Sequence, residues 1–175
     1  MTDNRRMSTD PFYGGTTNRI KNLRGFLSYL RDGPISRSAV KDWIISNTTA
    51  RSRDAVDPNI SFLAAIELIK INDDQVSLSR RGTQYLNDSK PEILYQALQS
   101  NVKGFNTILR ELEQNPMTDA DIRDLLVKSF PETEMTTARG AAHHREWLQV
   151  LGYIKRSDGV NTLTGTGHDL LAKTN

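Results

Sequence analysis

The residues best placed to do chemistry lie in the second half of the chain. His143 and His144 are adjacent, and three aspartates, Asp119, Asp121 and Asp124, are clustered upstream. Adjacent helical residues point about a quarter-turn or more apart, whereas two metal ligands on one helix face need a spacing of four residues. The aspartates match the start of a helix, where the helix dipole favours acidic side chains. We therefore predict no metal site.

Other kinds of catalytic site are also poorly supported. Gly165 and Gly167 resemble half of a phosphate-binding loop, but the lysine and the long glycine spacing of a Walker motif are missing, so we interpret them as a turn. The chain contains no cysteine, which excludes a disulfide framework, a thiolate zinc site and a cysteine nucleophile. No Ser-His-Asp set falls at suitable positions. We expect a protein that is not an enzyme and holds no cofactor.

Basic residues are the remaining candidates for a functional site, and they are unevenly distributed. Residues 1–90 contain 14 Lys and Arg against 10 Asp and Glu, a balance of +4. Residues 91–175 contain 9 against 11, a balance of −2. The first half is therefore the better candidate for binding a polyanion.

Length and composition place these residues in an ordinary globular protein. The chain has 175 residues, of which 37% are hydrophobic and 25% charged, and no apolar run approaches the roughly 18 residues that cross a bilayer. Residues 1–16 include two early arginines with no apolar stretch behind them, which is not a signal peptide. We interpret this segment as a polar arm and expect a cytoplasmic protein that does not bind membranes.

The sequence contains two copies of one unit. Residues 23–47 align with residues 105–129 at a constant offset of 82, and residues 62–86 align with residues 147–171 at an offset of 85. Apolar residues coincide at nine positions of the first alignment, Pro34 falls on Pro116, and Gly82 falls on Gly167. Each copy is roughly 70 residues long, which still permits a small core.

Hydrophobic periodicity predicts the elements of each copy. Two amphipathic helices are followed by a third, and the period then changes from helical to alternating for a short hairpin. Ser36 and Thr118 are suitable N-caps for the second helices. Asp57 followed by Pro58 is a helix-start signal, which predicts a late or broken third helix in the first copy. Trp43, Phe62 and Trp147 lie on the apolar stripes, and we expect them in the core.

The end of each copy is similar to that of winged helix-turn-helix domains. Leu151, Gly152, Tyr153 and Ile154 lead into a hairpin that ends in Leu163-Thr-Gly-Thr-Gly, and the first copy has the related Leu78-Ser-Arg-Arg-Gly. This resemblance covers nearly all of residues 17–174. It implies a mainly α fold with small β-wings: a polar arm (1–16), one winged-helix domain (17–89), a helical connector (90–104) and a second winged-helix domain (105–175).

The resemblance also implies a function, because tandem winged helices occur in archaeal and bacterial transcription regulators and in the recognition domains of restriction systems. The third helix of such domains usually enters the major groove of DNA, while the wing and helix ends contact phosphates. Glu132, Glu134 and Glu146 near the second copy's third helix would oppose phosphate. The candidate DNA-binding residues are Arg37, Lys41, Thr49, Arg51, Ser52, Arg53, Asn59, Lys70, Arg80, Arg81, Thr137, Arg139, His143, His144, Arg145, Lys155 and Arg156.

A second hypothesis remains open. Tandem winged helices also form protein-binding subunits of chromosome-condensing complexes, and the formal charge of only +2 favours that class, since strong DNA binders usually carry a basic excess. The leading hypothesis is double-stranded DNA binding, as a transcription regulator or as the recognition subunit of a restriction or defence system. The alternative is a module that binds a protein partner or a second copy of itself.

Overall fold

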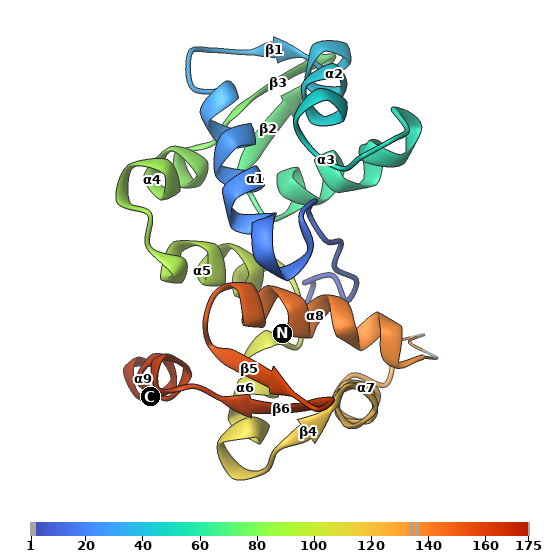
Figure 1. Cartoon of the computed structure of the whole chain (residues 1–175), viewed down its shortest axis with the longest axis vertical. Helices are drawn as coiled ribbons and strands as arrows, with labels where there is room; N and C mark the ends of the chain where they lie inside the picture. The colour runs from blue at the N-terminus through green and yellow to red at the C-terminus, as the bar shows by residue number, and fades with distance from the viewer. Residues whose placement is uncertain (1–2, 134, 136, 175) are drawn as a thin grey trace. The chain divides into compact units, whose positions relative to one another are not determined.

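The computed structural model describes residues 3–133, 135 and 137–174, and within it the chain forms two compact units. The first unit comprises Asp10–Asn101, and the second comprises Met1–Thr9 together with Val102–Asn175. Each unit is mainly helical with one small three-stranded antiparallel sheet (Figure 1). The predicted class, mainly α with small β-wings, is therefore confirmed. Among the described residues, no helix has the length and apolarity needed to cross a membrane.

The first unit has helices around a sheet of order β1-β3-β2. Besides the two strands of the predicted hairpin, the sheet contains β1, in which Ile35 pairs with Val76 of β3. A helix that the sequence interpretation did not specify, α4, follows the hairpin. The elements in chain order are α1 (Gly15–Tyr29), β1 (Ile35–Ser36), α2 (Arg37–Asn47), the 3-10 helix η1 (Asp54–Val56), α3 (Asp57–Ala65), β2 (Ile69–Asn72), β3 (Gln75–Leu78), α4 (Arg80–Asp88) and α5 (Pro91–Asn101).

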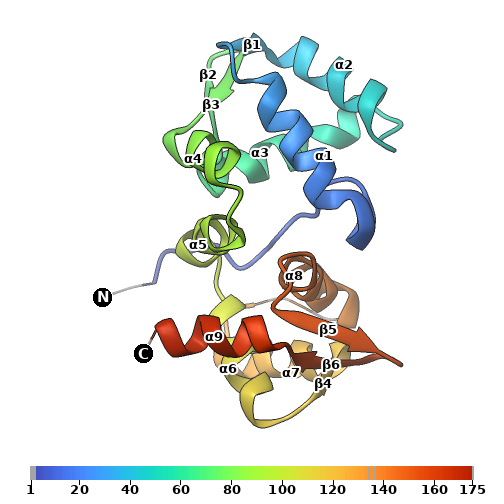
Figure 2. The same ribbon diagram turned by 60° about the vertical axis from the view of Figure 1, so that its left-hand side comes forward.

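The second unit repeats this order with a sheet β4-β6-β5. Helix α8 contacts both α7 and β5, and the two views agree on its place beside the hairpin (Figures 1 and 2). Gly165 and Gly167 lie in the helix after the hairpin, not in a turn, which corrects the sequence interpretation. The elements are α6 (Phe105–Gln114), β4 (Met117–Thr118), α7 (Asp119–Ser129), α8 (Ala138–Val150), β5 (Ile154–Ser157), β6 (Val160–Leu163) and α9 (Gly165–Lys173).

The two offsets found in the sequence are reproduced by the elements. Strands β1 and β4 and helices α2 and α7 begin and end 82 residues apart, and the hairpin strands and helices α4 and α9 do so at 85. Helices α3 and α8 end 85 residues apart, but α8 begins earlier, at the position where the first unit has η1. Asp57 and Pro58 open α3, so the predicted late start of this helix is confirmed.

Helix caps explain why the second helices begin where they do. The Ser36 side chain accepts a hydrogen bond from the Ala39 N–H at 3.1 Å, and the Thr118 side chain accepts one from the Asp121 N–H at 3.1 Å. The Asp121 carboxylate returns a bond to the Thr118 N–H, which completes a capping box. Both predicted N-caps are confirmed.

Each unit buries its own apolar stripes. Phe62 and Trp147 are each 1% exposed, as predicted, whereas Trp43 is only partly buried and stacks on Tyr29 with ring centroids 5.5 Å apart. The predicted polar arm also contributes: Phe12 is buried in the first unit, and the Arg6 carbonyl accepts the Lys103 N–H at 2.8 Å in the second. Residues of the arm thus belong to both units.

Gly82 and Gly167 are the glycines of the repeated ending. They lie in α4 and α9, where these helices contact the turn between the third helix and the hairpin of the same unit. A β-carbon added at Gly82 would lie well inside 3.0 Å of the Leu68 carbonyl oxygen, and one at Gly167 would lie as close to that of Tyr153. Backbone cannot yield as a side-chain tip does. The repeated glycine is therefore required by close packing.

Replacing Gly82 or Gly167 by alanine is expected to lower the free energy of unfolding by about 2 kcal/mol, the usual cost of overpacking a tight contact. Urea unfolding followed by circular dichroism measures the change. Gly165→Ala is the control, because a β-carbon at Gly165 would meet nothing within 4 Å. Equal stability of the Gly167 and Gly165 variants would contradict this explanation.

Candidate nucleic-acid interface

The segment between α2 and α3 presents polar and basic side chains to solvent. Thr49, Arg51, Ser52 and Arg53 are all exposed, and this stretch is irregular up to η1. Arg51 makes no ion pair among the described residues, whereas Arg53 pairs with Asp42 and donates to the Ser38 hydroxyl at 2.9 Å. The third helix begins only at Asp57. Arg51 and its neighbours thus precede the third helix.

Helix α3 itself offers little to a polyanion. Its residues include no lysine or arginine. Asn59, a candidate for reading bases, is occupied within the unit: its Nδ2 donates to the Pro11 carbonyl at 2.5 Å and its Oδ1 accepts from the Tyr13 hydroxyl at 3.0 Å. This corrects the sequence prediction, because both ends of the amide are already bonded. Asn59 instead fixes residues 11–13 to α3.

Two cations of α2 meet one carboxylate at the start of α3. Arg37 Nε lies 3.0 Å from Asp57 Oδ1, and Lys41 Nζ lies 2.9 Å from Asp57 Oδ2. The hydrogen bond from Lys41, assisted by that from Arg37, holds the pKa of Asp57 below its usual value despite partial desolvation. One unit of positive charge remains on the group. Arg37 and Lys41 therefore tie α2 to α3, which sequence reasoning missed.

Helix α8 carries the candidates of the second unit on different sides. Thr137 and Arg139 are exposed at its start, and Arg139 makes no ion pair among the described residues. Glu134 and Thr136, which the sequence interpretation also considered, lie outside the described residues. His143 is partly buried, with its Nδ1 3.3 Å from the Thr9 carbonyl oxygen. The exposed end of α8 is therefore its first turn.

His144 is fully buried, at 0% exposure, which corrects its prediction as a DNA contact. Its Nε2 donates to the Lys103 carbonyl at 2.9 Å, and its ring lies 4.9 Å from that of Phe105. Burial lowers the pKa of His144 from 6.5 to about 4. It is a neutral core residue: helical periodicity alone did not distinguish the inner face of α8 from the outer one.

Arg145 is also a structural residue, which corrects its prediction as a DNA contact. Its guanidinium forms two hydrogen bonds to the Asp119 carboxylate, at 3.1 and 2.9 Å, and its side chain is only 8% exposed. Buried Asn161 donates to the same carboxylate at 3.0 Å, and Arg156 lies 3.6 Å from it. Burial would raise the pKa of Asp119, but the bonds from Arg145 and Asn161 outweigh that effect and lower it. Asp119 is the centre of a structural network.

Both units thus link their second and third helices by an ion pair, but the two pairs have opposite polarity. Arg37 and Asp119 are equivalent residues, 82 positions apart, at the start of the second helix. In the first unit the cation is on the second helix and the carboxylate is on the third, whereas in the second unit the carboxylate is on the second helix and Arg145 is on the third. The charge reversal within the sequence alignment was a visible signal of this pairing.

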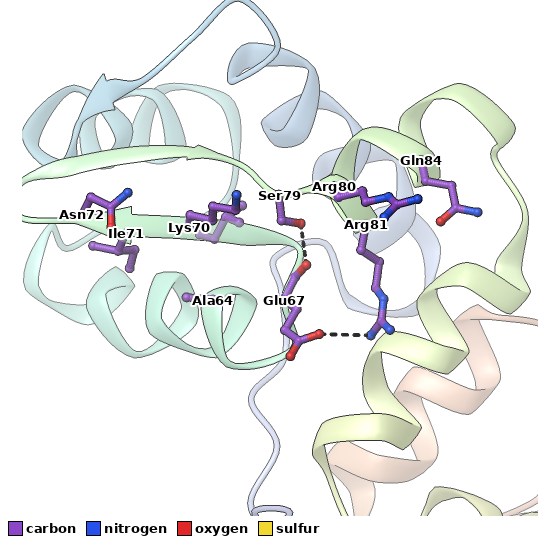
Figure 3. Close-up of a pocket in the computed structure, with 10 residues that line it drawn as sticks. Ala64, Glu67, Lys70, Ile71, Asn72, Ser79, Arg80, Arg81 and Gln84 are labelled. Atoms are coloured by element: carbon purple, nitrogen blue, oxygen red, sulfur yellow. Dashed lines mark hydrogen bonds and ion pairs between the residues drawn. The ribbon is translucent and has the colours of Figure 1, made fainter.

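The wing region of the first unit gathers three more candidates. Lys70 on β2 and Arg80 and Arg81 at the start of α4 line an open pocket, together with Glu67 (Figure 3). Lys70 and Arg80 are exposed. Arg81 Nη1 lies 3.7 Å from Glu67 Oε2. In the second unit, Lys155 and Arg156 are exposed on β5. No group of three metal-ligating side chains occurs within residues 3–133, 135 and 137–174.

The comparisons with known proteins find a similar fold among solved structures. No protein-family model and no curated protein sequence matches the chain. Among solved structures, the chain resembles the protein in a crystal structure of pyrene- and phenanthrene-modified DNA in complex with the BpuJ1 endonuclease binding domain. The TM-score is 0.58 at 13% identity, and the match covers 97% of this chain and 84% of that one. At this identity the two chains share a fold.

Proposed function

We propose that the protein binds double-stranded DNA as the recognition part of a restriction-type system. The observation that carries the proposal is the likeness in fold to the BpuJ1 endonuclease binding domain, which extends over 97% of the chain and whose structure is a complex with DNA. Within this proposal, residues 17–89 and 105–175 are two winged-helix domains, residues 90–104 connect them, and α3 and α8 are their third helices.

The proposed contacts are the exposed polar and basic side chains near the third helices and wings. Arg51 and Arg139 are the strongest, since each is exposed, lies just before or in the first turn of the third helix, and has no ion-pair partner among the described residues. An arginine in this place can pair bidentately with guanine or with phosphate. The proposed set is Thr49, Arg51, Ser52, Arg53, Lys70, Arg80, Arg81, Thr137, Arg139, His143, Lys155 and Arg156, with Arg37 and Lys41 contributing only their residual charge.

Replacing Arg51 and Arg139 together by alanine is expected to weaken duplex binding about 100-fold, because each arginine contributes about 1.4 kcal/mol when well paired. Fluorescence anisotropy with a labelled random-sequence duplex, repeated at several salt concentrations, measures both the affinity and the number of phosphates neutralised. Lys128→Gln is the control, since Lys128 is an exposed cation at the end of α7 and is not among the proposed contacts.

Two results would redirect the proposal. No duplex binding by the unmodified protein, even at low salt, would favour the protein-interaction module that the formal charge of +2 suggests. Binding that the double variant leaves unchanged would exclude the third-helix contacts while leaving DNA binding intact. A transcription regulator would use the same contacts, and co-purification of a nuclease chain with this protein would favour the restriction-type function over it.

A further inference from the structure

The first unit contains a cavity of about 760 Å³ between the end of α3, strand β2 and the start of α4. Figure 3 shows Lys70 on the strand, Arg80 and Arg81 at the head of the helix, and Glu67 below them. We call it the wing pocket, and define it by Ala64, Glu67, Lys70, Ser79, Arg80 and Arg81. Its volume is within the range of sites for small ligands, about 300–1,000 Å³.

The charge of the wing pocket is strongly positive for its size. Lys70, Arg80 and Arg81 line the pocket together with a single carboxylate, that of Glu67. Lys70 and Arg80 make no ion pair among the described residues, and Arg81 reaches Glu67 only at 3.7 Å. The Arg81 Nη1 atom is shielded from solvent and has no hydrogen-bond partner among the described residues. A buried guanidinium N–H without an acceptor favours an incoming anionic oxygen.

The backbone of the wing pocket holds Glu67 in an unusual conformation. Glu67 has φ of 66°, in the left-handed region that costs a residue with a β-carbon but not glycine. The equivalent residue of the second unit is Gly152, with φ of 85°. The first unit thus keeps a carboxylate where glycine is easier, and that carboxylate lies beside Arg81. The ion pair with Glu67 places Arg81 at the rim of the pocket.

The second copy shows that the fold does not need these cations. Residues equivalent to Glu67, Arg80 and Arg81 are Gly152, Gly165 and Thr166, and only Lys70 has a basic counterpart, Lys155. Both copies nevertheless form the same strand pairing and the same following helix, capped by Ser79 or Thr164. The basic residues of the wing pocket are therefore not required to build this junction.

We propose that the wing pocket binds a phosphate group, supplied either by the DNA backbone or by a free nucleotide-sized ligand. Three cations around one cavity match the charge and the several oxygens of a phosphate. The first internal hydrogen bond of α4 runs from the Thr83 N–H to the Ser79 carbonyl. The N–H groups of Arg80 and Arg81 come before it and add to the positive potential at the start of the helix. Only the DNA source rests on the proposed function.

The test uses the full chain and the variant Lys70→Gln/Arg80→Gln, which changes two exposed side chains. Inorganic pyrophosphate is titrated into the ¹⁵N-labelled protein, and the amide signals of residues 79–82 are followed by NMR. Duplex binding is measured in parallel by anisotropy. Lys155→Gln, the same wing position of the second copy, is the control for the pyrophosphate titration.

One outcome is that pyrophosphate shifts these signals, that the variant lowers the pyrophosphate affinity at least tenfold, and that the duplex affinity is unchanged. This outcome would assign the pocket to a free phosphorylated ligand. A variant that instead binds duplex tenfold more weakly, with a salt slope reduced by about two, would assign it to the DNA backbone. If the protein binds pyrophosphate in the pocket but binds no duplex, this inference is supported and the proposed function is contradicted. The inference is overturned if a folded variant binds both pyrophosphate and duplex with the same affinity as the unmodified protein. This holds however tightly the unmodified protein binds duplex.

Discussion

The Asp119→Asn substitution is expected to lower the free energy of unfolding of the second unit by about 3 kcal/mol. The carboxylate accepts two hydrogen bonds from Arg145, whose side chain is only 8% exposed, and one from buried Asn161. Removing one partner of a buried ion pair leaves the other charged and desolvated, which costs about 3–5 kcal/mol. The destabilisation therefore comes from the stranded guanidinium more than from the lost attraction.

Urea unfolding followed by tryptophan fluorescence tests this expectation. The chain has two tryptophans, one in each unit, so a Trp43→Phe background restricts the signal to Trp147 of the second unit. Asp124→Asn is the matched control, because Asp124 pairs with Arg123 at the surface and its side chain is 65% exposed. If both variants changed stability by less than about 0.5 kcal/mol, Asp119 would not be the centre of a structural network.

Acidification from pH 6.5 to pH 4 is expected to destabilise the second unit by up to about 3 kcal/mol through His144 alone. Burial lowers the pKa of His144 in the folded chain from 6.5 to about 4, so in this range the unfolded chain binds the proton and the folded chain does not. The contribution of neutral His144 is fully present above pH 6.5 and is lost as the pH falls. The lowered pKa values of Asp57 and Asp119 act in the same direction, but mainly below their ordinary value of 3.8.

His144→Gln separates this effect from the carboxylates. A glutamine Nε2 can still donate to the Lys103 carbonyl, yet it does not titrate. The free energy of unfolding of the variant, measured at pH 7 and at pH 4.5, is expected to change less with pH than that of the unmodified protein. A variant with the same pH dependence as the unmodified protein would show that some other group titrates in this range. His143→Gln is the control for the adjacent ring.

The elements of the fold were more accessible to sequence reasoning than the directions of the side chains. Apolar spacing and the self-alignment were sufficient to predict the three helices and the hairpin, because each is determined by local periodicity and capping. The short strands β1 and β4 were missed, since two residues have no period of their own and pair only after the hairpin exists. The helices after the hairpins were underestimated because glycine in their first turn looked like a loop signal.

The candidate site was harder to predict because charge alone does not distinguish a binding side chain from a structural one. Arg51 and Arg145 are both arginines near a third helix, but one is exposed and the other is bonded to Asp119. Asn59 and His144 were misjudged for the same reason: their partners, Pro11 and Lys103, are 48 and 41 residues away in the chain. Such distant acceptors leave no local signal.

The opposite polarity of the two ion pairs also bears on how a chain with two similar copies assembles. Helices α2 and α7 are equivalent at the 82-residue offset and each has 11 residues, so each could meet the other copy's third helix during folding. Helix α2 against α8 would bring Arg37 and Lys41 towards Arg145, and α7 against α3 would bring Asp119 towards Asp57. Both exchanges would juxtapose like charges, so the native pairing of each helix with its own copy is the one that these charges favour.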